Sequence, residues 1–305
     1  MNDLRPIALT SVIMKCFERI VLNNLNKQIS QLLEPFQFAY QPKRSVEDAL
    51  LVFSNSIYRH LDKANSYCRI LFVDFSSAFN TIQPHLLVKK LYNLNINKYV
   101  ISWILEYLSN RPQFVYVNGK TSNKLITNTG APQGCVISPV LFTLYTNDCQ
   151  SNSAVCNPLL KFADDTSLLG LISDKNETLY RSEVTNFVQW CEANHLELNV
   201  NKTKEMIIDF RKKDNAISPL EINDYTIEQV SEYKYLGVTI DDKLHWSGHI
   251  NNIKSKANKP LQFMRKLGPF KVDKTRITLF LNQLLRVFSL SVLLVGEGKF
   301  QRVIV

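Results

Sequence analysis

The stretch "KFADDTSLLG", residues 161–170, places two carboxylates side by side between apolar runs. The apolar segments 158–163 and 166–172 predict two strands of a hairpin with Asp164 and Asp165 at its tip. Two adjacent carboxylates cannot both stay ionised in a dry site without a counter-charge, and a divalent cation supplies one. The alternative is a plain surface β-turn, where Asp is common.

A second carboxylate, Asp74, stands at the end of the compact apolar strand "RILFVDF" (69–75). If this strand neighbours the hairpin in one sheet, the three acids converge. Such oxygen ligands suit Mg²⁺, which takes its remaining ligands from substrate phosphates. Two ions about 4 Å apart can activate a 3′-hydroxyl and stabilise a leaving pyrophosphate. Taken alone, Asp74 also fits a strand-end turn or a helix N-cap before Ser76.

The remaining pattern predicts helices and short strands in alternation. Helices are expected over 11–30, 46–61, 84–94, 98–109, 138–148 and 177–194, and along 247–295. Further strands are expected over 204–210, 220–223, 226–229 and 233–240, and a hairpin over 114–127 with Asn118-Gly119 at its turn. Mixed antiparallel strands with helices packed on one side describe an α+β domain with a basic helical segment appended.

Composition narrows the class of protein. The 305 residues are 45% hydrophobic and carry a net charge of +9, with a pI near 9.2, which favours a polyanionic partner such as nucleic acid. The six cysteines form no CxxC pair and are expected to be buried thiols in a reducing compartment. The apolar stretch 279–296 is interrupted by Asn282, Gln283 and Arg286, so a buried helix is expected there and no membrane association.

Ordered sequence blocks resemble a known family. "FVDFSSAFNTI" (72–82), "TGAPQGCVISPVLFTLYTND" (129–148) and "FADDTSLL" (162–169) look like motifs A, B and C of reverse transcriptases of non-LTR (LINE-type) retrotransposons. "LRPIALTSVIMKCFERIV" (4–21) and "QFAYQPKRSVEDAL" (37–50) resemble the family's fingers motifs. "LNVNKTKEM" (198–206) resembles motif D, "YKYLGVTID" (233–241) motif E, and "LHWSGHI" (244–250) the start of the thumb.

The resemblance implies a set of catalytic and metal-binding groups. The family's catalytic carboxylates match Asp74, Asp164 and Asp165, and the carbonyl of Phe75 would be a further metal ligand. Two Mg²⁺ ions are expected as cofactors, with Mn²⁺ as a substitute. Lys202 matches the motif D lysine that protonates pyrophosphate, with Lys204 as the alternative. Read without the family, either lysine is a solvated residue before a strand.

It also implies nucleotide and primer contacts. Arg5 and Arg44 match basic residues that hold the triphosphate, and Phe79 matches the ring that excludes a ribose 2′-OH. Gln133 and Gly134 match the loop that packs against the template–nucleotide pair. The primer-grip turn matches Tyr235, Leu236 and Gly237. Without the family, these are surface cations, core packing, a loop before a helix and an edge strand ending in Gly.

The expected architecture is a right-hand polymerase. Its fingers would be partial and span 1–66. The palm of antiparallel sheet and helices would span 67–241, with inserted fingers elements and the primer-grip hairpin. A truncated, basic helical thumb would span 242–305. The implied partners are an RNA template, a DNA primer and deoxynucleoside triphosphates, in the nucleus or cytoplasm. The sequence indicates no particular oligomeric state.

Some positions depart from the family pattern and keep rival readings open. Ala39-Tyr40-Gln41 stands where relatives often have Gly-Phe-Arg, Asn80 stands where many have Asp, and the chain looks like a partial copy. A catalytically inactive, nucleic-acid-binding remnant is therefore the first rival, and a metal-dependent nuclease using the same acids the second. An interaction module is a third. Two His/Cys pairs at helical spacing could ligate zinc but fit ordinary palm and thumb segments: Cys191/His195 and His245/His249.

Overall fold

The computed structural model of the chain describes residues 7–211, 217–267, 273, 275–276 and 279. Its helices are α1 (Val12–Ile29), α2 (Val46–Leu61), the 3-10 turn η1 (Ala78–Asn80), α3 (Pro84–Asn93), α4 (Lys98–Leu108), α5 (Ser138–Tyr145), α6 (Thr178–Ala193) and α7 (Ser247–Leu267). Its strands are β1 (Ser66–Val73), β2 (Arg111–Gln113), β3 (Tyr116–Val117), β4 (Lys120–Thr121), β5 (Leu125–Thr127), β6 (Leu159–Phe162), β7 (Asp165–Ser173), β8 (Lys204–Ile208), β9 (Glu221–Ile222), β10 (Tyr225–Thr226), β11 (Glu228–Gln229), β12 (Glu232–Tyr235) and β13 (Val238–Asp241).

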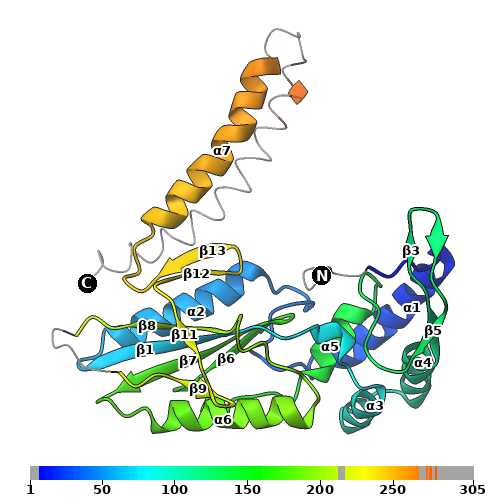
Figure 1. The fold of residues 1–305 in the computed structure, drawn as a ribbon, viewed down its shortest axis with the longest axis horizontal. Coiled ribbons are helices and arrows are strands. Elements are labelled where there is room, and N and C mark those ends of the chain that lie inside the picture. The colour runs from blue at the N-terminus through cyan, green and yellow to red at the C-terminus, as the bar shows by residue number, and fades with distance from the viewer. Residues whose placement is uncertain (1–6, 212–216, 268–272, 274, 277–278, 280–305) are drawn as a thin grey trace.

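A five-stranded sheet lies at the centre, with strand order β11-β8-β1-β7-β6 (Figure 1). β1 runs antiparallel to both β7 and β8, β6 runs antiparallel to β7, and β11 joins the edge of β8 in parallel. The hairpin expected around the acidic pair is confirmed as β6–β7. The strand expected to precede Asp74 is confirmed as β1, and it is the direct neighbour of that hairpin.

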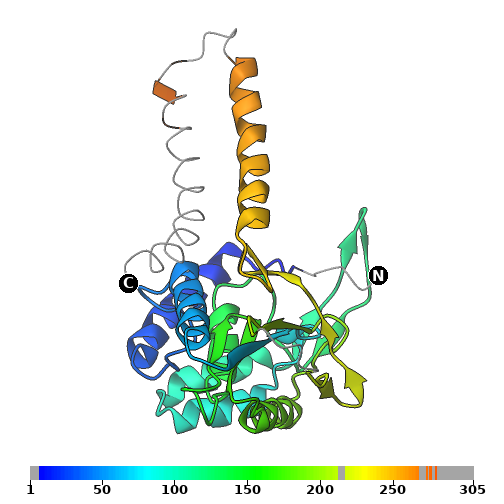
Figure 2. The ribbon, with the colours of Figure 1, turned by 90° about the vertical axis from the view of Figure 1, so that its left-hand side faces the viewer.

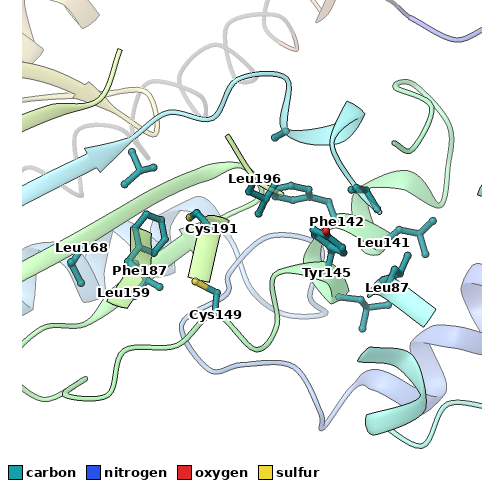
Figure 3. Close-up of a cluster of buried hydrophobic side chains, with 14 of the residues drawn as sticks. Leu87, Leu141, Phe142, Tyr145, Cys149, Leu159, Leu168, Phe187, Cys191 and Leu196 are labelled. Carbon is teal, nitrogen blue, oxygen red and sulfur yellow. The ribbon is translucent and has the colours of Figure 1, made fainter. Parts of the chain in front are cut away.

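Helices cover both faces of the sheet. As a consequence, the central strand β1 is buried along its whole length. Ile70 and Phe72 belong to the cluster that contains Phe53 of α2, whereas Leu71 belongs to the cluster that contains Phe187 of α6. Figure 3 shows the second cluster running from β6 and β7 past α6 to α5. The expectation of helices on one side only was therefore wrong. A continuous apolar run such as that of β1 is typical of a strand with two buried faces.

Local sequence signals explain where the elements begin. The Ser11 hydroxyl accepts a hydrogen bond from the backbone N–H of Met14 at the start of α1. Ser45 and Asp48 form a reciprocal capping box at the start of α2. The six helices expected between residues 11 and 194 are confirmed, with ends shifted by a few residues. The Asn118-Gly119 turn is confirmed between β3 and β4, with φ of 50° and 77°.

The apolar pattern predicted one continuous strand over 233–240, and this was wrong. The segment forms the β12–β13 hairpin. Leu236 and Gly237, with φ of 46° and 88°, form a tight turn between β12 and β13. Positive φ at both turn positions is typical of a two-residue hairpin loop. The strand expected over 204–210 ends at Ile208, and the segments 220–223 and 226–229 form the β9–β10 hairpin and β11. Of the helix expected over 247–295, α7 confirms the first part, and the remainder lies largely outside the described residues.

A buried ionic network ties the sheet to α6. Arg69 is fully buried in the middle of β1, and its guanidinium donates two hydrogen bonds to Glu205 of β8, at 2.9 and 2.8 Å. A third donor reaches Glu177, just before α6, at 2.7 Å. The hydroxyls of Tyr67 and Tyr180 donate to Glu177 and Glu205 respectively. A paired, hydrogen-bonded charge is the form in which an arginine is tolerated in a core.

Helix α7 projects away from the sheet (Figures 1 and 2). Its base is anchored on two elements of the body. The indole N–H of Trp246 donates to the hydroxyl of Tyr58 on α2 at 3.2 Å. The imidazole Nδ1 of His249 accepts a hydrogen bond from the backbone N–H of Thr239 on β13, also at 3.2 Å. Among the described residues, no helix is both long enough and apolar enough to cross a bilayer.

Candidate active site

Two of the predicted acids meet at one end of the central sheet. Asp74 follows directly on β1, and Asp165 is the first residue of β7. The ladder between these strands pairs Val73 with Thr166, so the next step of the same register sets Asp74 opposite Asp165. Opposite residues of an antiparallel pair have Cα atoms about 4.5–5.5 Å apart, with side chains on one face. The fold thus brings together two carboxylates that are far apart in the chain.

Asp164 lies in the turn that leads into this pair. Phe162 pairs with Asp165, so Ala163 and Asp164 form a two-residue turn, and Ala163 has φ of 58°. Tyr40, in the loop before α2, lies near this turn. Burial and the charge of Asp164 together raise the pKa of Tyr40 above its usual range. Asp164 is therefore near the 36–45 segment, whereas Asp74 and Asp165 lie toward the β12–β13 hairpin.

The backbone of Phe75 is oriented by a bridge to the segment that precedes β8. Phe75 and Leu198 form an antiparallel bridge, in which Ser76 N–H donates to the carbonyl of Glu197 and Asn199 N–H donates to that of Asp74. In this pattern the N–H and C=O of Phe75 point away from Leu198. They point to the side of β1 on which β7 lies. The role of this carbonyl as a metal ligand, which the family resemblance implies, stays a prediction.

The segment 197–203, which holds the predicted general acid, is bonded to the backbone of Asp74. The amide of Asn199 donates to the carbonyl of Asp74 at 2.9 Å, and the amide of Asp74 donates to the hydroxyl of Thr203 at 3.3 Å. Between these two contacts lies Lys202, which is exposed. Among the described residues its ammonium makes no hydrogen bond or ion pair. By contrast, the ammonium of Lys204 donates to Glu228 at 2.6 Å and to the carbonyl of Asn201 at 2.7 Å.

The donor set fits a magnesium ion that is completed by substrate. Within the described part of the chain, no group of three His, Cys, Asp or Glu side chains is arranged to hold a metal by itself. Magnesium is usually bound through one or two carboxylates, and its remaining ligands are water and substrate phosphate oxygens. Asp74, Asp165 and the carbonyl of Phe75 offer that kind of partial shell. The closed three-carboxylate centre stays a prediction.

The loop 129–137, which enters α5, packs tightly against the turn after β1. The amide of Ala131 donates to the carbonyl of Phe79 at 2.7 Å, and the amide of Gly130 donates to that of Ile82 at 2.7 Å. Gly130 has φ of 73°, and a Cβ there would lie 2.7 Å from backbone atoms of Asn80. Only glycine fits such a close backbone approach.

Gln133 and Gly134 lie at the far side of this loop, against the first described residues. The amide of Ala8 donates to the carbonyl of Gln133 at 2.7 Å. Gly134 has φ of 89°, and a Cβ there would lie 2.9 Å from the side chain of Ile7. The structure thus places both predicted nucleotide contacts in a loop held on two sides. Phe79 is half-buried, with its ring centroid 5.0 Å from that of Phe142, so it contributes to the core.

Of the two predicted triphosphate-binding arginines, Arg44 lies within the described residues and Arg5 does not. Arg44 is exposed, donates to the carbonyl of Pro35 at 2.7 Å, and lies 5.1 Å above the ring of Phe38. It is therefore held on the 34–38 segment, which pairs with β6 through hydrogen bonds of Phe38 and Phe36 to Lys161.

The β12–β13 hairpin forms one wall of a cleft beside the acids. The cleft has a volume of about 230 Å³ and is lined by Phe72, Val73, Asp165, Thr166, Tyr233, Lys234, Tyr235, Leu236 and Gly237. Tyr235 is only 3% exposed, and its hydroxyl accepts a hydrogen bond from Ser167 at 3.0 Å. Its side chain is therefore part of the core. The turn residues Leu236 and Gly237 remain the candidate primer contacts.

Tyr233 was missed by the sequence reasoning. Its ring stacks on that of Phe72, with centroids 4.0 Å apart and planes 12° apart. Burial raises the pKa of Tyr233, and the charges of Asp165 and Asp74 raise it further, so Tyr233 lies close to both acids. The alternation along β12 was the available signal, because Tyr233 and Tyr235 lie on one face of the strand.

The two zinc alternatives find no support in the geometry. Cys191 is buried in the apolar cluster of α6, where burial raises the pKa of its thiol, and His249 accepts the Thr239 amide described above. All six cysteines are free, and Cys16 and Cys156 are exposed, so the expectation of buried thiols holds for the other four.

Comparison with known proteins decides the family. A model of the family described as "Reverse transcriptase (RNA-dependent DNA polymerase)" matches residues 1–240. The chain belongs to the reverse transcriptase family. The expected family is confirmed, and the matched residues include the acids, the 129–137 loop and nearly all of the β12–β13 hairpin. The acids, the loop and the hairpin are therefore parts of a reverse transcriptase domain.

The relatives come from mobile elements. "Probable RNA-directed DNA polymerase from transposon BS" of Drosophila melanogaster is 27% identical over 273 residues, covering 86% of this chain and 30% of that protein. "RNA-directed DNA polymerase from mobile element jockey" of the same fly is 27% identical over 268 residues, covering 83% of this chain and 28% of that protein. This reverse transcriptase chain therefore spans less than a third of the length of these relatives.

Solved structures agree on the fold. Apo telomerase from Candida tropicalis, truncated from its C-terminal domain, aligns with a TM-score of 0.51 and 15% identity, covering 76% of this chain and 44% of that one. The Candida tropicalis telomerase in complex with a TWJ fragment of telomeric RNA aligns with a TM-score of 0.51 and 14% identity, covering 76% and 36%. The mixed α/β sheet architecture of a reverse transcriptase is thereby confirmed.

Proposed function

We propose that the chain is the polymerase portion of a non-LTR retrotransposon protein. It adds deoxynucleotides to the 3′-hydroxyl of a DNA primer under the direction of an RNA template. The observation that carries this proposal is the register of β1 and β7, which sets Asp74 opposite Asp165 beside the loop and hairpin of the same family motifs. The names of the relatives support the source and the reaction, and the RNA-bound telomerase supports an RNA partner.

Each of the site's elements has a role in this reaction. Asp74, Asp165 and the carbonyl of Phe75 would hold the two magnesium ions together with Asp164. When bound, these ions lower the pKa of the primer hydroxyl and neutralise charge on the phosphates. Lys202 would give a proton to the pyrophosphate. Gln133 and Gly134 would contact the incoming nucleotide, and the Leu236-Gly237 turn would hold the primer end.

The proposed function also divides the chain into the fingers, palm and thumb of a polymerase. We assign residues 1–66 to the fingers, 67–241 to the palm and 242–305 to the thumb, which includes α7. Phe79 would exclude a 2′-hydroxyl at the sugar; its backbone carbonyl is bonded to the 129–137 loop and its ring is half-buried. Arg44 would have to release the carbonyl of Pro35 to reach a triphosphate, so its present contact argues for a role in shaping the loop.

Primer extension on poly(rA)/oligo(dT) with Mg²⁺ or Mn²⁺ tests the proposal. The wild-type chain should extend the primer, and Asp165→Asn and Asp164→Asn should each abolish extension. Asp224→Asn is the matched control, because Asp224 is also an exposed residue in a tight hairpin turn, between β9 and β10, and does not line the cleft beside the acids. Binding of the primer–template without extension would favour the inactive remnant. Strand cleavage that depends on the same acids would favour the nuclease.

A further inference from the structure

A buried acid of α1 holds one end of the nucleotide-contact loop 129–137. Glu18 is 0% exposed, although it lies in a helix near the surface. Its carboxylate oxygen Oε2 accepts hydrogen bonds from the amides of Val136 at 2.6 Å and Ile137 at 3.2 Å. These amides immediately precede α5, which begins at Ser138, so the carboxylate also faces the positive end of a helix dipole. Its second oxygen, Oε1, is buried and has no hydrogen-bond partner among the described residues.

A half-buried base of β2 holds the other end of the same loop. One guanidinium nitrogen of Arg111 donates to the carbonyls of Thr129 at 2.6 Å and Gly130 at 2.7 Å. Its Nε donates to the carbonyl of Leu108 at the end of α4, at 3.2 Å. Burial lowers the pKa of Arg111, because removal from water disfavours the charged form of the guanidinium.

The two contacts have a shared consequence. One charge binds amides at the C-terminal end of the loop, and the opposite charge binds carbonyls at its N-terminal end. Charge-assisted hydrogen bonds are roughly twice as strong as neutral ones, so the loop ends are held firmly. Gln133 and Gly134 lie between the two ends. A bonded loop of this kind presents its middle residues in one position, which reduces the ordering that a ligand must bring about.

We propose that Glu18 and Arg111 are positioning residues that set the 129–137 loop for the incoming deoxynucleoside triphosphate. They touch neither the nucleotide nor the acids and act through the backbone of the loop. This inference rests on the proposed polymerase function and extends it to residues on α1 and β2. Glu18 stands in the apolar pattern of α1, where an unpaired acid would be costly, and among the described residues the loop amides are the hydrogen-bond donors that offset this cost.

The test combines steady-state kinetics with hydrogen exchange. Glu18→Gln keeps one acceptor oxygen but loses the charge, and Glu18→Ala loses both. We expect KM for the deoxynucleotide to rise about tenfold in Glu18→Gln and further in Glu18→Ala, with kcat within about twofold of wild type. Arg111→Lys should raise KM in the same way, since an ammonium cannot reproduce the guanidinium fork. Amide exchange at residues 133–137 should accelerate in each variant.

Glu183→Gln is the matched control. Glu183 is also a buried acid, 7% exposed, and it holds a loop by accepting from the Asn152 amide and the Ser153 hydroxyl, both at 3.2 Å. That loop is remote from the site, so this variant should leave KM for the nucleotide unchanged even where it lowers stability. An equal rise in KM for Glu183→Gln, or an unchanged KM in Glu18→Ala, would overturn the inference.

Failure of the proposed function gives a different result. If the wild-type chain does not extend a primer at all, the polymerase proposal fails, and the positioning claim is then decided by exchange alone. Faster exchange at 133–137 in Glu18→Gln and Arg111→Lys, with none in Glu183→Gln, would support the loop contacts. Exchange unchanged in all three would overturn them.

Discussion

At the scale of single residues, the structure separates two lysines that the sequence left as alternatives. The ammonium of Lys204 is held by Glu228 and by the carbonyl of Asn201, whereas Lys202 is exposed in the segment bonded to the backbone of Asp74. A general acid contributes typically 10²–10⁴-fold, so Lys202→Ala should lower kcat for primer extension by about a hundredfold. Lys204→Ala should change kcat little. Single-turnover nucleotide incorporation measures both, and the opposite order would reassign the acid to Lys204.

Two glycines with similar backbone angles isolate the effect of close packing. Gly130 and Gly119 have φ of 73° and 77°, but only at Gly130 would a Cβ meet backbone atoms, those of Asn80 at 2.7 Å. A non-glycine residue at such φ costs of order 1–3 kcal/mol of strain. Gly119→Ala should therefore show only this strain in urea unfolding, and Gly130→Ala should lose at least about 1 kcal/mol more. Equal losses would mean that the loop can move away from η1.

Some site residues could be read from the sequence, and others could not, for a physical reason. Asp74, Asp164 and Asp165 stand out because ionised groups are rare in apolar runs. Tyr233 gives only the alternation along β12, which marks a strand face but not a site, and Glu18 gives no local signal. The proximity of Tyr233 to the acids arises from the β12–β13 turn, and the role of Glu18 depends on amides more than a hundred residues away in the chain. Contacts of that kind are set by tertiary packing and leave no trace in spacing.

At the scale of elements, the ionic network between β1, β8 and α6 predicts how stability depends on pH. Burial alone would raise the pKa of Glu177, but hydrogen bonds from Tyr67 and Arg69 outweigh it and lower the pKa below the usual value. A carboxylate whose folded-state pKa is depressed stabilises the fold above its unfolded pKa of about 4.3, and this contribution is lost as pH falls through the folded value. Urea unfolding should thus show a stability loss below about pH 4.3 that is smaller in Glu177→Gln.

The same network predicts the effect of removing its cation. Arg69→Ala would leave the buried carboxylate of Glu205 without its two guanidinium hydrogen bonds, at 2.9 and 2.8 Å. Breaking a buried pair from one side typically costs about 3–5 kcal/mol. Replacing both partners by apolar residues, as in Arg69→Met with Glu205→Leu, should recover most of that loss. A double variant as unstable as Arg69→Ala in urea unfolding would show that the network has a role besides charge pairing.

Element boundaries were predictable where side chains act on their own backbone. Ser11, and Ser45 with Asp48, mark the starts of α1 and α2, and Asn118-Gly119 marks a turn. The β12–β13 turn was expected from the family resemblance but not from the apolar pattern, because Leu236 is a bulky residue at φ of 46°, which local propensity disfavours. Packing of both strands on the cluster around Phe72 imposes that turn.

At the scale of the whole molecule, the basic helix α7 predicts a salt-dependent affinity for nucleic acid. Lys254 and Lys256 are exposed on this helix. Each phosphate contact adds about 0.9 to the magnitude of the slope of log K against log salt for a B-form duplex. Lys254→Ala with Lys256→Ala should therefore reduce that slope by up to about 2 in binding titrations with a primer–template. Lys89→Ala with Lys98→Ala, on α3 and α4 at the opposite end of the molecule (Figure 1), should leave the slope unchanged.

The global arrangement was only partly accessible from the sequence. Apolar periodicity predicted the strands, but not that helices cover both faces of the sheet. That outcome requires partners for each face of β1, and these come from α2 before it and α6 well after it in the chain. From the sequence, the acids were expected to converge only if the strand before Asp74 paired with the hairpin that carries Asp164 and Asp165. The structure meets that condition, and the placement of Asp74 beside Asp165 follows from it.

Helix α7 projects from contacts at its base, so a small rotation at the base moves its far end over a much longer distance. Its 21 residues span about 31 Å at 1.5 Å per residue, and its base is fastened near Trp246 and His249. A rotation of about 10° at that base would sweep the far end through about 5 Å, roughly one helical turn. Under the proposed function, a duplex would advance past the acids by one nucleotide at each addition, and a small rotation around Tyr58 and Thr239 would carry the far end of α7 through a displacement of that order.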